Sequence, residues 1–291
     1  MKKALLLVVA VVMTLSITAC GTAAPRMERV PFEAMVVADT EEYKITITDV
    51  SVSGRYGVTF LLENRGSDEL GLSVEGYVNG LFFSLVDWEA EKKVAAPGEQ
   101  VECYLEFLNY GEFSVGAMTN IELIVSPSVA KAMEGGGMWY NTIESYTVQI
   151  YPYGEENAAV YEYVPKESHR VLVDNEYMTL IYVGNTSMGD ARLYLQNHTD
   201  KDVMLCAVDN RALLNGSVEG SVYFNMFTPP QAQTFGIVFA VWPGNEGDGT
   251  HKYIKTDTIG ITAELIDIST QEAMYISDEI TLSLSGVKVT E

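Results

Sequence analysis

Short runs in which apolar and polar residues alternate recur along most of this 291-residue chain. Because successive side chains of a strand point to opposite faces, such runs predict strands with one buried face. Turn sequences such as Asn79-Gly80 and Pro97-Gly98 separate the runs. A helical pattern is confined to one expected turn over 128–134, ahead of three glycines. The clearest alternating runs are 43–48, 101–107 and 146–150.

The same order of sequence features returns in the second half of the chain. Each echo comes between 132 and 136 positions after its counterpart. A nearly constant offset is expected of two homologous domains that differ by short loop insertions, and it is far longer than the repeat of a solenoid. The paired features are Glu42-Tyr43 with Glu176-Tyr177, Asn64 with Asn197, Asn79-Gly80 with Asn215-Gly216, Pro97 with Pro229, and Tyr146-Thr147-Val148 with Glu279-Ile280-Thr281.

This repeat predicts an all-β fold of two tandem immunoglobulin-like β-sandwich domains. Each repeat holds about seven short strands in about 110–120 residues, with frequent turns. We expect the first domain over 39–153, a linker over 154–170 and the second domain over 171–286. Neither domain has the Cys…Trp…Cys spacing of antibody domains, so the comparison concerns architecture only.

The N-terminus predicts export. Lys2 and Lys3 precede a mostly apolar run over 4–19, which is short for a membrane span but suits a secretory signal peptide. The run ends in Ile-Thr-Ala-Cys-Gly at 17–21, which resembles the lipobox of bacterial lipoproteins. The resemblance implies that Cys20 receives a diacylglyceryl group and becomes the new N-terminus after cleavage.

A lipidated Cys20 sets the expected location. Residues 1–19 would be removed as the signal peptide, and 20–38 would form a short tether that contains Pro25 and Pro31. Two acyl chains on one residue satisfy the requirement for stable anchoring. Later in the sequence no segment has 18 consecutive apolar residues. We therefore expect an extracytoplasmic protein, anchored at the outer face of the cytoplasmic membrane without spanning it.

The charge balance narrows the range of partners. Asp and Glu number 40 against 18 Lys and Arg, which gives a formal net charge of −22. Nucleic acids and anionic lipid surfaces both favour Lys and Arg. We therefore expect no nucleic-acid partner and no electrostatic docking on lipid. Apolar residues make up 47% of the chain, which predicts a folded body rather than disorder.

The two cysteines beyond the lipobox are Cys103 and Cys206, and each lies within an apolar, strand-like run. Such residues usually behave as small buried hydrophobic side chains. A disulfide between them is the alternative for an oxidising compartment. A nucleophilic role needs a neighbouring base, and none lies near either cysteine in the sequence.

The second repeat also resembles a known group of proteins. It opens with Val-Asp-Asn-Glu-Tyr at 173–177, continues through Leu-Tyr-Leu-Gln-Asn-His-Thr-Asp-Lys-Asp at 193–202 and reaches Leu-Asn-Gly at 214–216. This looks like the uncharacterised tandem immunoglobulin-like domains of lipoproteins from Gram-positive bacteria, and 63–68 match the pattern more loosely. The resemblance implies the fold, and it carries no catalytic residues.

Two groups of residues are weak candidates for ligand binding. The acidic, glycine-rich segment 245–249 contains Glu246 and Asp248, and clustered carboxylates suit calcium, although the spacing is not that of an EF-hand. The other group lies in and beside the linker, where aromatic rings can stack on sugars or pack the linker onto the domains. Its members are Tyr151, Tyr153, Tyr161 and Tyr163.

Catalytic and metal-binding motifs are missing from the sequence. The three histidines, His169, His198 and His251, are scattered, and no nucleophile elbow, Walker loop, zinc motif or dinucleotide fingerprint occurs. We therefore predict a non-catalytic protein without a cofactor or metal, which binds or scaffolds an unidentified protein partner. An exposed apolar patch on one domain would favour that prediction. The alternative is a glycan- or calcium-binding lipoprotein, which a cleft lined by the linker tyrosines would favour.

Overall fold

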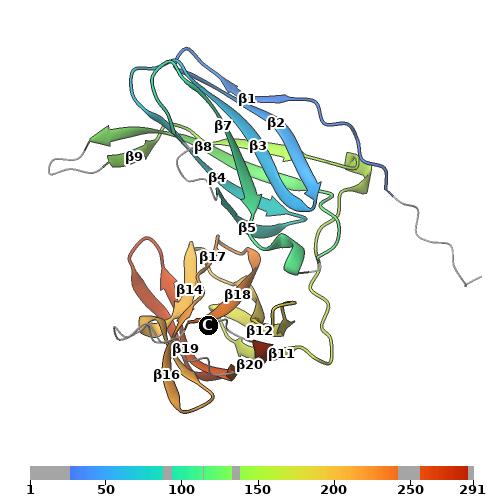
Figure 1. Ribbon diagram of the computed structural model, residues 1–291, viewed down its shortest axis with the longest axis vertical. Coiled ribbons are helices and arrows are strands. Elements are labelled where there is room, and N and C mark those ends of the chain that lie inside the picture. Colours follow the sequence, from blue (N-terminus) through green and yellow to red (C-terminus); the bar gives the residue numbers. More distant parts are fainter. Residues whose placement is uncertain (1–26, 88–93, 114, 133–137, 242–255, 288–291) are drawn as a thin grey trace, which may run out of the picture.

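The structure is a computed structural model that describes residues 27–87, 94–113, 115–132, 138–241 and 256–287. These residues form strands β1 to β20 and a few three-residue 3-10 turns, arranged in two β-sandwich units (Figure 1). The predicted all-β sandwich fold is confirmed. Within the described ranges, no helix is long and apolar enough to span a membrane.

The first unit contains β1 to β10, and its strand pairs are antiparallel. One sheet has the order β1-β2-β3-β7. In the facing sheet β4 pairs with β8. Strands β5 and β6 lie along the other edge of β4, and β9 and β10 lie along the other edge of β8. The strands are β1 (Met35–Asp39), β2 (Tyr43–Ser53), β3 (Arg55–Asn64), β4 (Leu70–Val78), β5 (Leu81–Val86), β6 (Val94–Ala95), β7 (Gln100–Phe107), β8 (Ile121–Ala132), β9 (Met138–Thr142) and β10 (Tyr146–Ile150).

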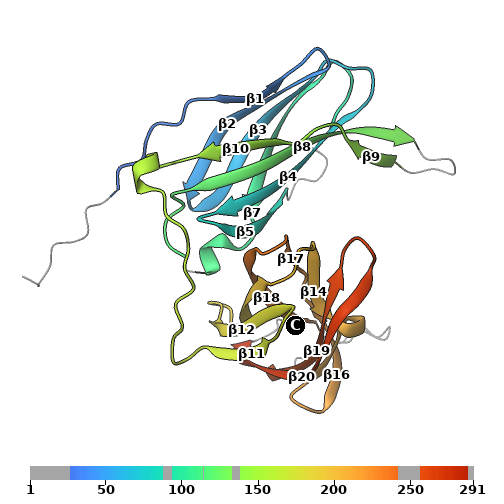
Figure 2. The same ribbon diagram turned by 180° about the vertical axis from the view of Figure 1, so that it is seen from behind.

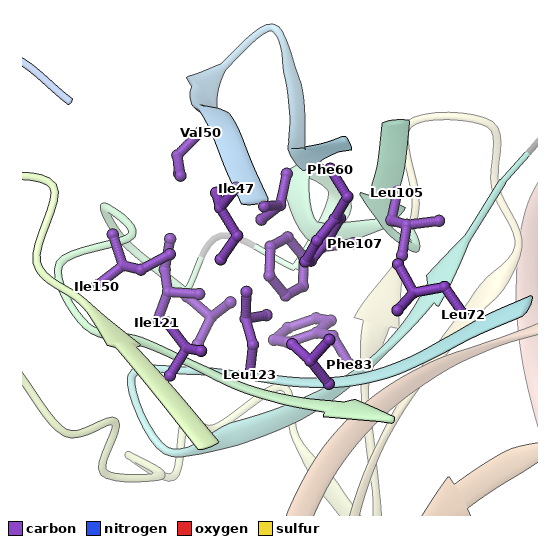
Figure 3. Close-up of a cluster of buried hydrophobic side chains, with 14 of the residues drawn as sticks. Ile47, Val50, Phe60, Leu72, Phe83, Leu105, Phe107, Ile121, Leu123 and Ile150 are labelled. Atoms are coloured by element: carbon purple, nitrogen blue, oxygen red, sulfur yellow. The ribbon is translucent and has the colours of Figure 1, made fainter. Parts of the chain in front are cut away.

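Side chains from both sheets fill the interior of the first unit (Figure 3). Ile47, Phe60 and Leu105 point inward from one sheet, and Phe83 and Leu123 from the other. All five are at most 2% exposed. Since each buried side chain of this size contributes about 1.5–3 kcal/mol relative to an exposed one, this interior is the main source of the unit's stability.

The second unit repeats this arrangement. Its order β11-β12-β13-β18 matches β1-β2-β3-β7, and β14 and β15 pair with β19, which pairs with β20. A separate buried cluster lies between these sheets. The strands are β11 (Arg170–Asp174), β12 (Met178–Asn185), β13 (Ala191–Asn197), β14 (Val203–Ala207), β15 (Arg211–Leu214), β16 (Val218–Tyr223), β17 (Met226–Thr228), β18 (Gln233–Val241), β19 (Thr256–Asp267) and β20 (Glu272–Val287).

Asn64 and Asn197 occupy equivalent places in the two units. Each ends its strand and is buried, and its Nδ2 donates to a carbonyl oxygen of the loop that follows, at Asp68 or Lys201, and to one at the end of a later strand, at Ala95 or Thr228. Each Oδ1 accepts the backbone N–H two residues later, at Gly66 and Thr199, at 2.9 Å in both cases. One side chain therefore ties together the same corner of both sandwiches.

The hydrogen bonds also correct the alignment of one echoed pair. Thr40 Oγ1 accepts the N–H groups of Glu42 and Tyr43, and Asn175 Oδ1 accepts those of Tyr177 and Met178. Tyr43 therefore corresponds to Met178 rather than to Tyr177. Both Tyr43 and Met178 are buried at the start of the second strand of their unit.

Two other expectations differ from the structure. The helical turn over 128–134 is wrong where it is described, because β8 continues to Ala132 between β4 and β9. The first strand starts at Met35, within the segment that we assigned to the tether. The described part of that segment lies against the first unit, where Val30 donates its N–H to the Pro152 carbonyl at 2.9 Å.

The two units meet through a short parallel pairing of β5 with β18. Gln233 pairs with Leu81 and Thr234 with Phe82, and Thr234 Oγ1 donates to the Phe82 carbonyl at 2.8 Å. In both views β5 is the strand of the first unit that lies beside β17 and β18 (Figures 1 and 2). One sheet therefore runs from the first unit into the second. We call the contact region between the units the junction.

Candidate functional site

The residues proposed for lipidation and calcium binding, Cys20, Glu246 and Asp248, lie outside the described residues. Among the residues that the structure does describe, no three His, Cys, Asp or Glu side chains come together as a metal site would require.

Tyr163 packs against two other rings at the junction. Its ring stacks on Tyr194 with centroids 4.6 Å apart and on His169 at 5.6 Å. Its hydroxyl also lies 2.7 Å from His169 Nδ1. Burial raises the pKa of the Tyr163 hydroxyl, and it lowers the pKa of His169, with a smaller effect from Lys166. Because the ring stacks on two neighbours, Tyr163 acts here as a packing residue.

Tyr161 also holds the linker in place. Its N–H donates to the Asn79 carbonyl at 2.7 Å, and its ring meets the edge of Phe235 at 5.7 Å. Tyr153 packs against the core of the first unit, and Tyr151 is half-buried. Three of the four tyrosines thus have packing partners, in or next to the linker. The structure brings Tyr161 and Tyr163 to the junction but does not arrange the tyrosines as a row of exposed rings.

Cys103 and Cys206 are buried, and neither forms a disulfide. Cys206 Sγ lies 3.7 Å from Glu264 Oε1. Burial, and then the nearby Glu264 carboxylate, raise the pKa of the Cys206 thiol to about 11. The thiol is therefore protonated at neutral pH, which disfavours a nucleophilic role.

Aromatic stacking and polar contacts hold the junction together. The Phe235 ring stacks on Phe113 of the first unit with centroids 5.1 Å apart, and it contacts Tyr194 at 5.3 Å. Arg192 donates from its guanidinium to the Glu112 carbonyl at 2.6 Å. Phe235 is thus the residue on which rings from both units and from the linker converge.

Next to this cluster a groove opens where strands diverge. After the short β5–β18 pairing, β5 turns toward β7 and β18 turns toward β16. The space left between them has a volume of about 270 Å³. It is lined by residues of both units, and none of them is charged. The lining residues include Phe83, Leu108, Asn109, Phe113, Tyr223, Asn225, Phe227, Phe235, Ile237 and Phe239. We call this space the groove.

Three aromatic side chains on the second unit's side of the groove are exposed to solvent. Tyr223 is 56% exposed, Phe239 43% and Phe227 42%. Tyr223 and Phe239 are paired across β16 and β18, while Phe227 lies on β17. Exposed apolar groups that gather beside a groove often mark an interaction surface. These residues could not be singled out from the sequence, because alternation alone does not show which aromatic positions of a strand face solvent.

A second hollow, with a volume of about 680 Å³, is lined by residues of the second unit alone. Strands β15, β16, β19 and β20 contribute its lining, which includes the charged residues Asp209, Arg211, Glu219 and Glu279. Its floor passes Gly260, where a Cβ atom would lie 3.0 Å from a carboxylate oxygen of Glu279. Unlike the groove, this hollow has charged lining residues, and three of the four are acidic.

No family model and no curated protein sequence matches this chain. Among solved structures, a crystal structure of the YadV chaperone is similar over 83% of this chain and 100% of its own length, with 12% sequence identity and a TM-score of 0.24. A likeness of that size carries no argument about the function of this protein.

Proposed function

We propose that this protein is a membrane-anchored extracytoplasmic lipoprotein that binds another protein and performs no catalysis. The observation that carries the proposal is the exposed aromatic patch of Tyr223, Phe227 and Phe239 on the second unit. Burying such rings against a partner gains about 25 cal/mol per Å² of apolar surface. Rigid aromatic side chains also dominate the binding energy of many protein interfaces.

The alternative is a lipoprotein that binds a glycan or calcium. The hollow whose lining includes Asp209, Arg211 and Glu219 favours this alternative, because such groups can hydrogen-bond to sugar hydroxyls. The linker tyrosines favour it less, since Tyr161 and Tyr163 already pack against other rings.

The location is tested with a Cys20→Ala variant. If Cys20 carries the lipid, the native protein fractionates with membranes, and the variant is released or remains unprocessed. Fractionation followed by mass spectrometry of the N-terminal peptide gives the readout. A variant that stayed in the membrane fraction with a normally cleaved N-terminus would contradict the proposed anchor.

The protein-binding role is tested by photo-cross-linking in intact cells. A photoreactive side chain placed at Tyr223 in the full chain should give an adduct with one defined protein, because this position is exposed within the patch. The same group at Glu102, which is exposed on β7 of the first unit, is the matched control. Equal labelling at both positions would count against the proposal. A rise in melting temperature with calcium or a cell-wall glycan, without any adduct, would support the alternative.

A further inference from the structure

The groove is continuous with the contacts that join the two units. Phe113 and Phe235 stack on each other in the junction, and both also line the groove. Beyond them the same aromatic surface emerges at Phe227 and Phe239. The groove is therefore an open extension of the junction, where apolar surface that packs internally at one end is left to solvent at the other.

The size of the groove limits what can enter it. A volume of about 270 Å³ corresponds to roughly nine water molecules. One or two large side chains fit in that space. The body of a helix, with a diameter of about 10–12 Å, does not lie within it. Asn109 and Asn225 also line the groove, and their side-chain amides can donate to or accept from a peptide backbone. This combination suits an extended polypeptide that inserts an apolar side chain.

The charge of the chain and of the groove indicates whether the groove binds a second copy of this chain or a different protein. The groove has no charged lining residue, although one residue in five of the chain is charged. Two mature copies, which lack Lys2 and Lys3, would each bring a net charge of 16 − 40 = −24 into contact, and like charges of that size repel. A charged side chain entering the groove would lose its hydration with no counter-ion there. The lining therefore favours an uncharged segment of another protein.

We propose that the groove between β5 and β18 is the docking site for a short, extended, uncharged segment of a partner protein, anchored by a large apolar side chain. This inference rests on the proposed protein-binding function and names the site and the partner chemistry. The anchor would contact Phe113 of the first unit and Phe227 of the second, so that both units contribute to one site.

The test uses the full mature chain and a panel of end-capped hexapeptides as probes. One set is uncharged with a central Phe or Leu, and the matched set carries Asp or Lys at that position. We expect saturable binding of the uncharged set only, measured by fluorescence anisotropy of labelled peptides. A Phe227→Ser substitution should weaken binding about tenfold or more. The matched control is Ile276→Ser, because Ile276 is an apolar residue outside the groove that is exposed at least as much as Phe227, 56% against 42%.

Each other outcome overturns the inference. Absence of binding by every uncharged peptide, equal binding of both sets, or equal effects of Phe227→Ser and Ile276→Ser would each do so. A dimer that Phe227→Ser dissociates in sedimentation would make a second copy the occupant. The proposed function can fail separately. In-cell adducts at Tyr223 that persist in Phe227→Ser would leave the function standing without the groove. Peptide binding that depends on Phe227, without any in-cell adduct, would leave the groove as a peptide site but contradict the proposed function.

Discussion

A single carboxylate secures the turn between β19 and β20. The Asp267 side chain is 3% exposed and accepts from Lys201 Nζ at 2.5 Å and from Ser269 Oγ at 2.6 Å. Its Oδ1 also accepts the backbone N–H of Ser269 at 2.9 Å. The Lys201 contact, then the Ser269 hydroxyl, hold the pKa of Asp267 well below its usual value near 3.8. Burial opposes this effect but does not outweigh it.

This arrangement predicts an acid-dependent loss of stability. Because the pKa of Asp267 is lowered in the folded state, its contribution is present above about pH 4, the unfolded value, and is lost as the pH falls further. We expect Asp267→Asn to lower the melting temperature at pH 7 and to flatten its decline between pH 4 and pH 2. Circular dichroism at a series of pH values gives both quantities. Asp278→Asn, at an exposed position, is the control, and matching profiles for the two variants would contradict this role.

Each unit contains an Asn-Gly turn that joins two of its own strands. Asn79 and Gly80 have φ angles of 53° and 79°, and Asn215 and Gly216 have 50° and 69°. Positive φ at both central residues is the mark of a type I′ turn, whose twist suits a β-hairpin. Both asparagines also accept N–H groups from the strand or loop beside them, at Thr119 and at Asp257. The turns thus fix the register of β4 with β5 and of β15 with β16.

Gly216 offers a clean test of the strain in such a turn. An added Cβ would meet nothing within 4 Å, so a Gly216→Ala substitution changes backbone strain alone. We expect a loss of about 1 kcal/mol of unfolding free energy, because an L-residue at positive φ is disfavoured. Urea denaturation measures it. Gly66→Ala is the matched control, since its Cβ would make only ordinary contacts at 3.5–3.8 Å. An equal loss in both variants would argue against the strain explanation.

At the level of elements, alternation and turn chemistry predict the strands well but not their phase. On β2 the buried positions run 43, 45 and 47 and then change to 50 and 52, because the register with β3 shifts between Ile47 and Asp49. Such bulges leave no local sequence mark. The expected helical turn at 128–134 failed for a related reason. Pairing of β8 with β4 and β9 outweighed the local preference of its residues.

In the whole molecule, Phe235 holds the two units and the linker together. Its ring contacts Phe113, Tyr161 and Tyr194, so it joins the first unit, the linker and the second unit. We expect Phe235→Ala to cost roughly 2–3 kcal/mol, less than a fully buried Phe would, and to increase the radius of gyration as the units separate. Small-angle scattering and thermal denaturation measure the two effects. Phe239→Ala, on the same strand but outside these stacks, should change neither by as much. An unchanged radius of gyration in Phe235→Ala would contradict this role.

The groove is also a feature of the whole molecule, and for this reason it could not be predicted from the sequence. The groove exists because β5 and β18, whose paired residues Phe82 and Thr234 are 152 positions apart, meet briefly and then part. Local patterns identify each strand but not their contact. The aromatic residues Tyr223, Phe227 and Phe239 alternate with buried neighbours as core residues do. Only the register and the junction show that they are exposed.

The pairing of β5 with β18 also leads us to expect an order for folding. Each unit completes its antiparallel strand pairs from residues closer in sequence than the junction, which closes a loop of about 150 residues, so we expect the junction to form late. The groove takes its two walls from opposite sides of that junction. The groove is thus complete only when both units have folded and the junction has formed. A partner that recognises the groove would therefore not bind chains that are still folding.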